Sequence, residues 1–322
     1  MGAPAAIAEL KEICAYSWHG ESANQAQRAL RRRAFSGIDD SNIAAGPPSD
    51  LSPERCEVFI SPVDSQGDAT LCLIVEGKDE RSEALCITYN DEVGIIDAYG
   101  SRRIKKKEIL QMIDEIKTEE AAFVQVDSDY FLQLLNNALS LNEKYDFPLP
   151  LELCYRKDML KGHLAPSPFT PGFRLSLLRR IRKDSSLLKR GAEILEKDAF
   201  AEWPLSSYSS FDYAEQWIYT KVGRPLSLMD NACIKQFSLE VLLPNKGLIS
   251  KRLTFAAYFL EKMGDIDGVE LSLASALELH SKRGRQFIEI PFIKELAKKS
   301  IEYCATQISE GSDPREYYED ID

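Results

Sequence analysis

The residues that could do chemistry in this chain are mainly cations, and they are densest in FRLSLLRRIRKDSSLLKRG at residues 173–191. Leucine and isoleucine are interleaved with these cations, which predicts a pair of amphipathic basic helices. Such a surface could be neutralised by nucleic acid, by an acidic partner protein, or by an acidic face of the same chain, for which the acidic C-terminus is a candidate. The candidate partner-binding residues are Arg174, Arg179, Arg180, Arg182 and Lys183.

A second basic cluster, YGSRRIKKK at residues 99–107, combines a turn with cations just ahead of a helix that we predict at 103–118. The first turn of a helix together with nearby cations can hold a phosphate group. Arg102, Arg103 and Lys105 are therefore candidate anion-binding residues. A solvated run of charge gives the same pattern and remains the alternative.

Motifs for catalysis or cofactor binding are missing from the sequence. The histidines, His19, His163 and His280, form neither an HExxH motif nor a pair four residues apart, so a histidine-based metal site is not expected. The glycine patterns that hold phosphates, GxxxxGK[ST] and GxGxxG, do not occur. The sequence therefore predicts no catalytic residue, no cofactor and no metal, and it favours a protein that is not an enzyme.

The cysteines do not suggest covalent or metal chemistry. Seven is an odd number, and no CxxC pair occurs among Cys14, Cys56, Cys72, Cys86, Cys154, Cys233 and Cys304. Neither a disulfide framework nor a zinc site is expected from such a set. Cys72 and Cys86 lie inside apolar, strand-like runs, where a free cysteine behaves as a small buried hydrophobe. We interpret both as residues of the core.

Composition restricts the possible partners and the location. A net charge of −11 argues against bulk binding to nucleic acid or to an anionic membrane, although local basic patches can still bind. No apolar run approaches the ~20 residues that a membrane span needs. The N-terminus lacks the basic region of a signal peptide. We therefore expect a cytoplasmic protein without a membrane partner.

The elements that must position the basic segments fall into an α+β half and a helical half. Short β-branched or aromatic runs at 57–63, 69–77, 83–90 and 93–100 predict strands, and the short connections between them favour an antiparallel sheet. Apolar periodicity predicts helices after the sheet and throughout the second half. The expected segments are 1–37, two N-terminal helices; 38–54, a linker; 55–162, an α+β domain; 163–172, a Pro-rich linker; 173–308, a helical domain; and 309–322, an acidic tail that we expect to be mobile.

The clearest architectural unit in the helical half is a hairpin of two helices at 250–279, with a turn at 263–267. Gly264 can end the first helix, and Asp265 or Asp267 can cap the second. This hairpin resembles a tetratricopeptide repeat in the turn and second helix, at Gly264, Asp265, Ala276, Leu277, Glu278 and Leu279. It departs from that family where Leu253, Ala257 and Leu260 replace the expected tryptophan, glycine and tyrosine. No second copy follows at a 34-residue period, so a generic helical hairpin is the alternative.

The order of parts along the whole chain also resembles a family of uncharacterised bacterial proteins. The resemblance rests on the β-rich part, on FVQVDSDYFLQLLNNALSLNEKYDFPLPLEL, and on the C-terminal RLTFAAYFLEKMGD and IPFIKELAKKSIEYC. It implies a bacterial cytoplasmic protein and supplies no catalytic residue.

These observations favour a non-enzymatic adaptor that binds a so far unknown protein through its C-terminal helical domain. The first alternative is association with nucleic acid through the basic segments 28–33 and 174–190. The second is an enzyme whose site is assembled from dispersed residues.

Overall fold

The structure is a computed structural model that describes residues 56–76, 81–109, 111, 123–156, 159–160, 173–220, 231–282 and 284–317. The expected N-terminal helices, both linkers and the basic segment 28–33 lie outside these residues. The chain divides into two compact units, which we call the sheet unit (up to Ser61, and Gly67–Pro171) and the helical unit (Pro62–Gln66 and Gly172–Asp322).

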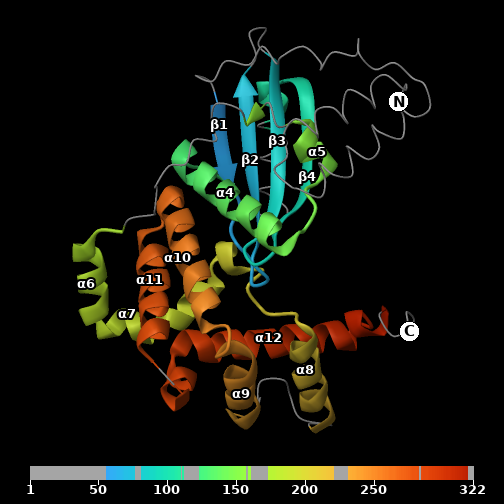
Figure 1. Ribbon diagram of the computed structural model, residues 1–322. Helices are drawn as coiled ribbons and strands as arrows, with labels where there is room; N and C mark the ends of the chain where they lie inside the picture. The colour runs from blue at the N-terminus through green and yellow to red at the C-terminus, as the bar shows by residue number, and fades with distance from the viewer. Residues whose placement is uncertain are drawn as a thin grey trace. The chain divides into compact units, whose positions relative to one another are not determined.

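The sheet unit is built on a five-stranded antiparallel sheet, which confirms the predicted α+β class and the antiparallel hairpins (Figure 1). The strand order is β4-β3-β2-β1-β5. The strands are β1 Cys56–Ile60, β2 Asp68–Glu76, β3 Arg81–Asn90, β4 Gly94–Lys105 and β5 Val124–Gln125.

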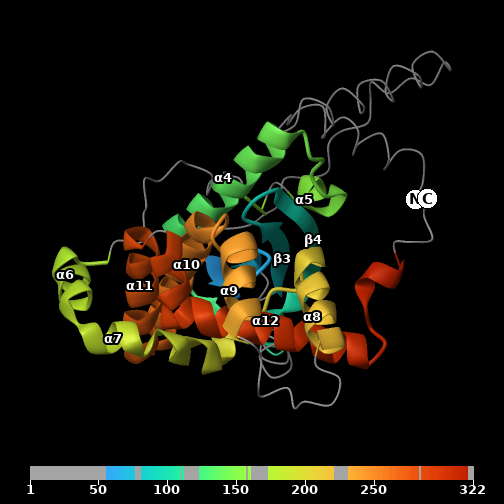
Figure 2. The same cartoon turned by 90° about the horizontal axis from the view of Figure 1, so that it is seen from below.

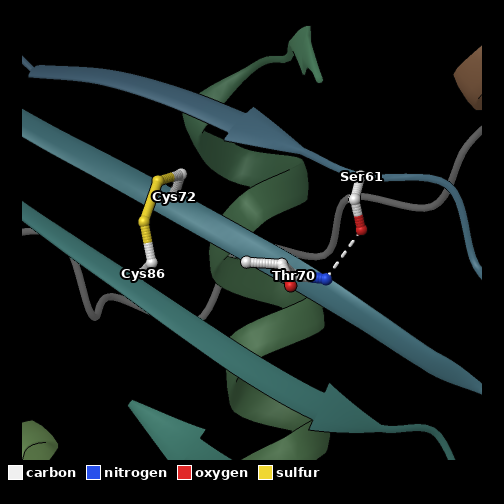
Figure 3. The surroundings of a disulfide bond; sticks show 4 residues. All are labelled: Ser61, Thr70, Cys72 and Cys86. Atoms are coloured by element: carbon white, nitrogen blue, oxygen red, sulfur yellow. Dashed lines mark hydrogen bonds between the residues drawn. A yellow bond between two sulfur atoms is a disulfide. The ribbon is translucent and has the colours of Figure 1, made fainter. Parts of the chain in front are cut away.

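The two faces of this sheet carry different side chains, because successive residues of a strand point to opposite sides. On the face covered by helix α4 (Ser128–Tyr145), Leu71, Leu85 and Ile87 are fully buried. The opposite face carries Cys72 and Cys86, which stand directly across from each other on β2 and β3. In Figure 3 the helix lies behind the strands and the two cysteines lie on the near side.

Cys72 and Cys86 form a disulfide bond, so our interpretation of them as free core cysteines was wrong. Their spacing of fourteen residues carries no recognisable signal. The pairing follows from the register of β2 against β3, which places the two residues opposite each other. Register depends on the whole sheet and on the turn between the strands. Both cysteines still contribute to an apolar cluster on this face, as expected.

Strand β4 is longer than predicted and takes up the start of the helix expected at 103–118. Its last residues, Ile104 and Lys105, pair with Ser82 and Arg81 of β3, and helical conformation begins only at Lys106. The backbone of β3 continues to Arg81 and supplies hydrogen-bond partners for this extension. Pairing with a neighbouring strand thus overrides the local helical periodicity.

Asn142 of α4 closes part of the outer edge of β4, which is an edge strand. The Ile95 N–H donates to its Oδ1 at 2.6 Å, and its Nδ2 donates to the Ile95 carbonyl at 2.9 Å. Asn142 is fully buried, so its amide takes the place of a further strand at this point. The approach needs Gly94, whose φ is +104°, because a Cβ there would lie 2.3 Å from Asn142 Oδ1 and 2.7 Å from the Ala138 carbonyl oxygen.

The helical unit contains the helices expected in the second half of the chain. Among its described residues the α-helices are α6 Leu175–Lys183, α7 Ser185–Lys189, α8 Tyr208–Thr220, α9 Asn231–Phe237, α10 Lys246–Met263, α11 Ile266–Ser281 and α12 Pro291–Ser309. A π-helical turn follows α9 at Ser238–Leu242, and 3-10 helices lie at Gly191–Glu196, Asp198–Phe200, Gly284–Glu289 and Pro314–Tyr317. Among the described residues, no helix combines the length and apolar character needed to cross a membrane.

The predicted helical hairpin is confirmed as α10 and α11. Gly264 ends α10 in the left-handed region, with φ +79°, and the Asp265 carboxylate caps α11 by accepting from the Gly268 N–H at 2.9 Å. The two helices are close enough for the Ser272 hydroxyl to donate to the Leu253 carbonyl at 2.7 Å. The buried alanines of the two helices, Ala256, Ala257, Ala274 and Ala276, permit this approach.

The loop between β1 and β2, Pro62–Gln66, belongs to the helical unit. Trp203 Nε1 donates to the Val63 carbonyl at 3.0 Å, and the buried Arg252 guanidinium donates to the carbonyls of Ser65 and Gln66. The carbonyl groups of this loop thereby accept hydrogen bonds from a buried guanidinium and from a buried indole of the helical unit.

Replacing Asn142 by leucine tests the closure of the β4 edge. The change leaves the buried N–H and C=O of Ile95 without partners, and each such group costs about 1–3 kcal/mol. We expect the free energy of unfolding of the sheet unit to fall by about 2–5 kcal/mol, measured by native-state hydrogen exchange at β4. Asn137→Leu, at an exposed position of the same helix, should change it by less than about 0.5 kcal/mol. Equal losses of unfolding free energy in the two variants would show that Asn142 does not close the edge of β4.

Candidate partner-binding surface

The basic segment predicted from the sequence forms two short helices, α6 and α7, joined at Asp184. The Asp184 carboxylate accepts from the Ser186 N–H at 2.9 Å and from the Ser186 hydroxyl at 2.6 Å. These bonds cap α7, and they hold the pKa of Asp184 below its ordinary value. The cap separates the two helices and fixes the direction in which each presents its cations.

Both helices are anchored by apolar side chains. Ile181 of α6 and Leu187 of α7 are buried, and both helices contact α11. In the two views of the helical unit, α6 and α7 lie beside α11 (Figures 1 and 2). The apolar residues of the predicted amphipathic pair therefore face the hairpin, and the opposite side of α6 is open.

The beginning of α11 neutralises part of the basic charge. Lys197 Nζ lies 2.5 Å from Asp265 Oδ2, and Arg190 makes two parallel hydrogen bonds of 3.1 Å to Asp267. One turn further on, Arg180 pairs with Glu270. Carboxylates near the N-terminus of a helix also complement its dipole. The contacts with Glu193 and Asp267 raise the pKa of Arg190.

Five cations of the segment remain without a partner within the part of the chain that the structure describes. They are Arg174, Arg179, Arg182, Lys183 and Lys189, and all five are exposed. Arg179, Arg182 and Lys183 are spaced three and four residues apart, so they share one side of α6. Leu175, four residues before Arg179, lies on the same side and is 69% exposed. We call Leu175, Arg179, Arg182 and Lys183 the α6 stripe.

The beginning of the expected acidic tail is attached to α8 rather than to the basic segment. Arg315 pairs with Asp313, with Asp212 at 2.8 Å and with Glu215 at 3.2 Å. Arg315 also lies over the ring of Phe211, 5.7 Å from its centroid. The hydrogen bonds from Arg315 hold the pKa of the buried Asp313 below its ordinary value. These contacts connect the start of the tail to two carboxylates of α8, and the mobility of the tail stays a prediction.

The second candidate cluster lies on a strand that leads directly into a helix. Arg102, Arg103 and Lys105 belong to β4, and helical conformation follows from Lys106. The side chains of Arg102 and Arg103 lie outside the described part of the structure, and Lys105 is exposed. The neighbouring Lys106 is bound by Glu57 at 2.9 Å and by Glu76. The anion-binding role of the three residues stays a prediction.

The described residues contain no group of three or more His, Cys, Asp or Glu side chains placed to hold a metal ion. Of the three histidines only His280 is described, and it is exposed at the end of α11. The aromatic loop after residue 200 is anchored by Trp203, which is buried and lies edge-on to Phe292 with centroids 5.9 Å apart.

The partners of the basic segment were not identifiable from the sequence. Glu270 lies 90 residues from Arg180, and Asp267 lies 77 residues from Arg190. Asp267 was recognised only as a possible helix cap and Glu270 was not singled out, because their pairing with these cations depends on where α6 and α7 pack. The packing therefore decides which of the predicted binding residues are available: Arg180 is paired, and the α6 stripe is not.

No protein-family model matches this chain, and no match was found among curated proteins or among solved structures.

Asp265→Ala tests the role of the acidic turn. Burial would raise the pKa of Asp265, but the Lys197 ammonium and the Gly268 N–H outweigh it and lower the pKa below the ordinary value. A lowered pKa stabilises the fold above the unfolded value of about 3.9, and this stabilisation is lost as pH falls through the folded value.

We expect Asp265→Ala to lower the free energy of unfolding by about 1–2 kcal/mol at pH 7, and the difference from the parent protein to shrink below about pH 4. Urea titrations followed by tryptophan fluorescence measure both. The control is Asp198→Ala, because the exposed Asp198 makes no ion pair with a described residue. A difference that stays constant between pH 7 and pH 3 would show that the carboxylate charge does not stabilise the turn.

Proposed function

We propose that this protein is a non-enzymatic interaction protein, and that its α6 stripe binds an acidic segment of a partner protein. The observation that carries the proposal is the exposed Leu175 beside three unpaired cations on one side of α6. The resemblance of the α10–α11 hairpin to a tetratricopeptide repeat supports an interaction role for the unit that holds the stripe.

The charge pattern of the stripe favours an anionic partner. Like charges three and four residues apart on a helix repel each other by about 0.2–0.5 kcal/mol per pair. Arg179 stands in this relation to both Arg182 and Lys183. Carboxylates of a partner remove the repulsion and form charge-assisted hydrogen bonds, which are stronger than neutral ones. Arg180, by contrast, is already paired with Glu270 and therefore contributes little to the binding of an anionic partner.

Leu175 favours a protein over a nucleic acid as that partner. A leucine side chain contributes about 1.5–3 kcal/mol when it becomes fully buried, and an apolar residue of a peptide can cover it. A phosphate backbone offers no apolar surface of this kind. Stacking platforms for bases are built from exposed aromatic side chains, and within the stripe there is none. Nucleic acid is therefore an outcome for the test to exclude.

Charge reversal on the stripe tests the proposal. The probe is a fluorescein-labelled peptide of Glu, Asp and Leu residues, titrated with the full chain in a fluorescence-anisotropy assay at two salt concentrations. We expect Arg179→Glu with Arg182→Glu to weaken binding by about tenfold or more, since two attractive contacts become repulsive. Added salt should weaken binding by the parent protein.

The matched control is Lys235→Glu with Lys294→Glu, which alters net charge by the same amount at exposed positions of α9 and α12. It should leave the affinity within about twofold, because distant surface charges are screened. Equal weakening by both double variants would reduce the effect to net charge and refute the stripe as the site. A labelled DNA duplex that binds more tightly than the peptide, with a steep salt dependence, would replace the proposal by nucleic-acid binding.

A further inference from the structure

The disulfide between Cys72 and Cys86 joins two strands that are already held together without it. Nine consecutive pairs connect β2 and β3, from Asp68 opposite Asn90 to Glu76 opposite Ser82. The cysteine Cα atoms are 4.3 Å apart, which is the spacing of a pair without mutual backbone hydrogen bonds, where side chains come closest. The backbone therefore keeps the two cysteines opposite each other whether or not the sulfurs are bonded.

The two sulfurs differ in their access to solvent. Cys72 is buried, with 1% of its surface exposed, and Phe59 of β1 stands on its other side. Cys86 is half-buried, and its neighbour across the sheet on β4 is Tyr99, which is 49% exposed. An attacking thiolate can therefore reach the pair from the side of Cys86 and not from the side of Cys72.

The other described cysteines, Cys56, Cys154, Cys233 and Cys304, remain thiols. Thiols are the usual state of cysteine where glutathione is kept reduced, and the disulfides found in such surroundings are mostly transient or redox-sensing. Among the described cysteines one disulfide stands beside four thiols, and the sheet does not depend on that disulfide. Both features are typical of a transient or redox-sensing disulfide.

We infer that Cys72 and Cys86 form a reversible thiol–disulfide site whose co-reactant is a thiol of low molecular weight. In reduction, the thiolate of a first small thiol attacks Cys86 Sγ, the Sγ–Sγ bond breaks, and Cys72 leaves as a thiolate. A second small thiol then attacks the mixed disulfide and releases Cys86. The two small thiols are oxidised to their disulfide, and their two protons end on Cys72 and Cys86.

Reduction changes the packing on this face of the sheet. Two thiol sulfurs cannot stay at bonding distance and must separate to van der Waals contact. They share an apolar cluster with Phe59, Ile109 and Phe123, and a close-packed core responds to even small changes in the space its side chains occupy. The site thereby couples the redox state to the residues at 106–109 and 123–126.

The test equilibrates the full chain in buffers of reduced and oxidised glutathione, quenches with acid, alkylates the thiols and measures each cysteine by mass spectrometry. We expect Cys72 and Cys86 to change together, from mostly bonded to mostly alkylated over about a 100-fold range of [GSH]²/[GSSG], as mass action requires for a two-electron couple. Cys304 should be a thiol in every buffer. A bond that persists at the highest ratio would show a permanent cross-link, and one absent at the lowest ratio would remove the site.

Two single substitutions test the direction of attack, with circular dichroism to confirm folding. With oxidised glutathione, Cys72→Ala should acquire glutathione at Cys86, and Cys86→Ala should acquire none at Cys72, because that sulfur is buried. Labelling of both positions to the same extent would contradict the assigned order. If either variant fails to fold, hydrogen exchange of the parent protein tests the coupling between the redox state and the packing on this face of the sheet. Faster exchange at 123–126 after reduction supports this coupling. Identical exchange in the reduced and oxidised states refutes it.

Discussion

The arrangement of the helical unit depends on the acidic turn that begins α11. Asp265, Asp267 and Glu270 form ion pairs with Lys197, Arg190 and Arg180, respectively. The Asp265 carboxylate also caps the helix. One short stretch thus completes a helix end, complements the helix dipole and binds the segment that precedes α8. Because these pairs are partly exposed, each contributes little alone. Their effect is positional: they set which side of α6 faces α11 and which side stays open.

The unpaired cations follow from this arrangement. A chain with a net charge of −11 could neutralise a local basic segment entirely, yet several of its described acidic groups are paired with other cations. Arg315 forms ion pairs with Asp212 and Glu215 of α8 and with Asp313. These carboxylates are therefore already paired with a cation of the C-terminal segment. The cations of the α6 stripe remain beside an exposed leucine, and this combination supports a surface that is completed by another molecule.

Buried polar groups perform a different task, which is to specify how each unit is assembled. Asn142 completes the hydrogen bonding of an edge strand, and Arg252 is satisfied by carbonyls of the loop Pro62–Gln66. An unpaired buried polar group costs free energy, so alternative packings that separate these hydrogen-bond partners are disfavoured. The same sheet holds the Cys72–Cys86 pair by register alone, so the bond can open and close while the ladder persists.

Features that depend on local periodicity were determined by the sequence itself. Short β-branched and aromatic runs predicted the strands. Helical spacing with Gly264 and Asp265 predicted the α10–α11 hairpin, because burying one face of a helix requires that repeat. The amphipathic basic helices were predicted in the same way. Only the tertiary structure decided what depends on meetings between distant residues: the pairing of Arg180 with Glu270, the disulfide set by register, the extension of β4 to Lys105, and the loop held by Arg252. A pair interaction across many residues leaves no periodic trace in the chain, since either partner alone looks like an ordinary surface or core residue. The sequence therefore identified the candidate cations, and packing selected those that are available to a partner.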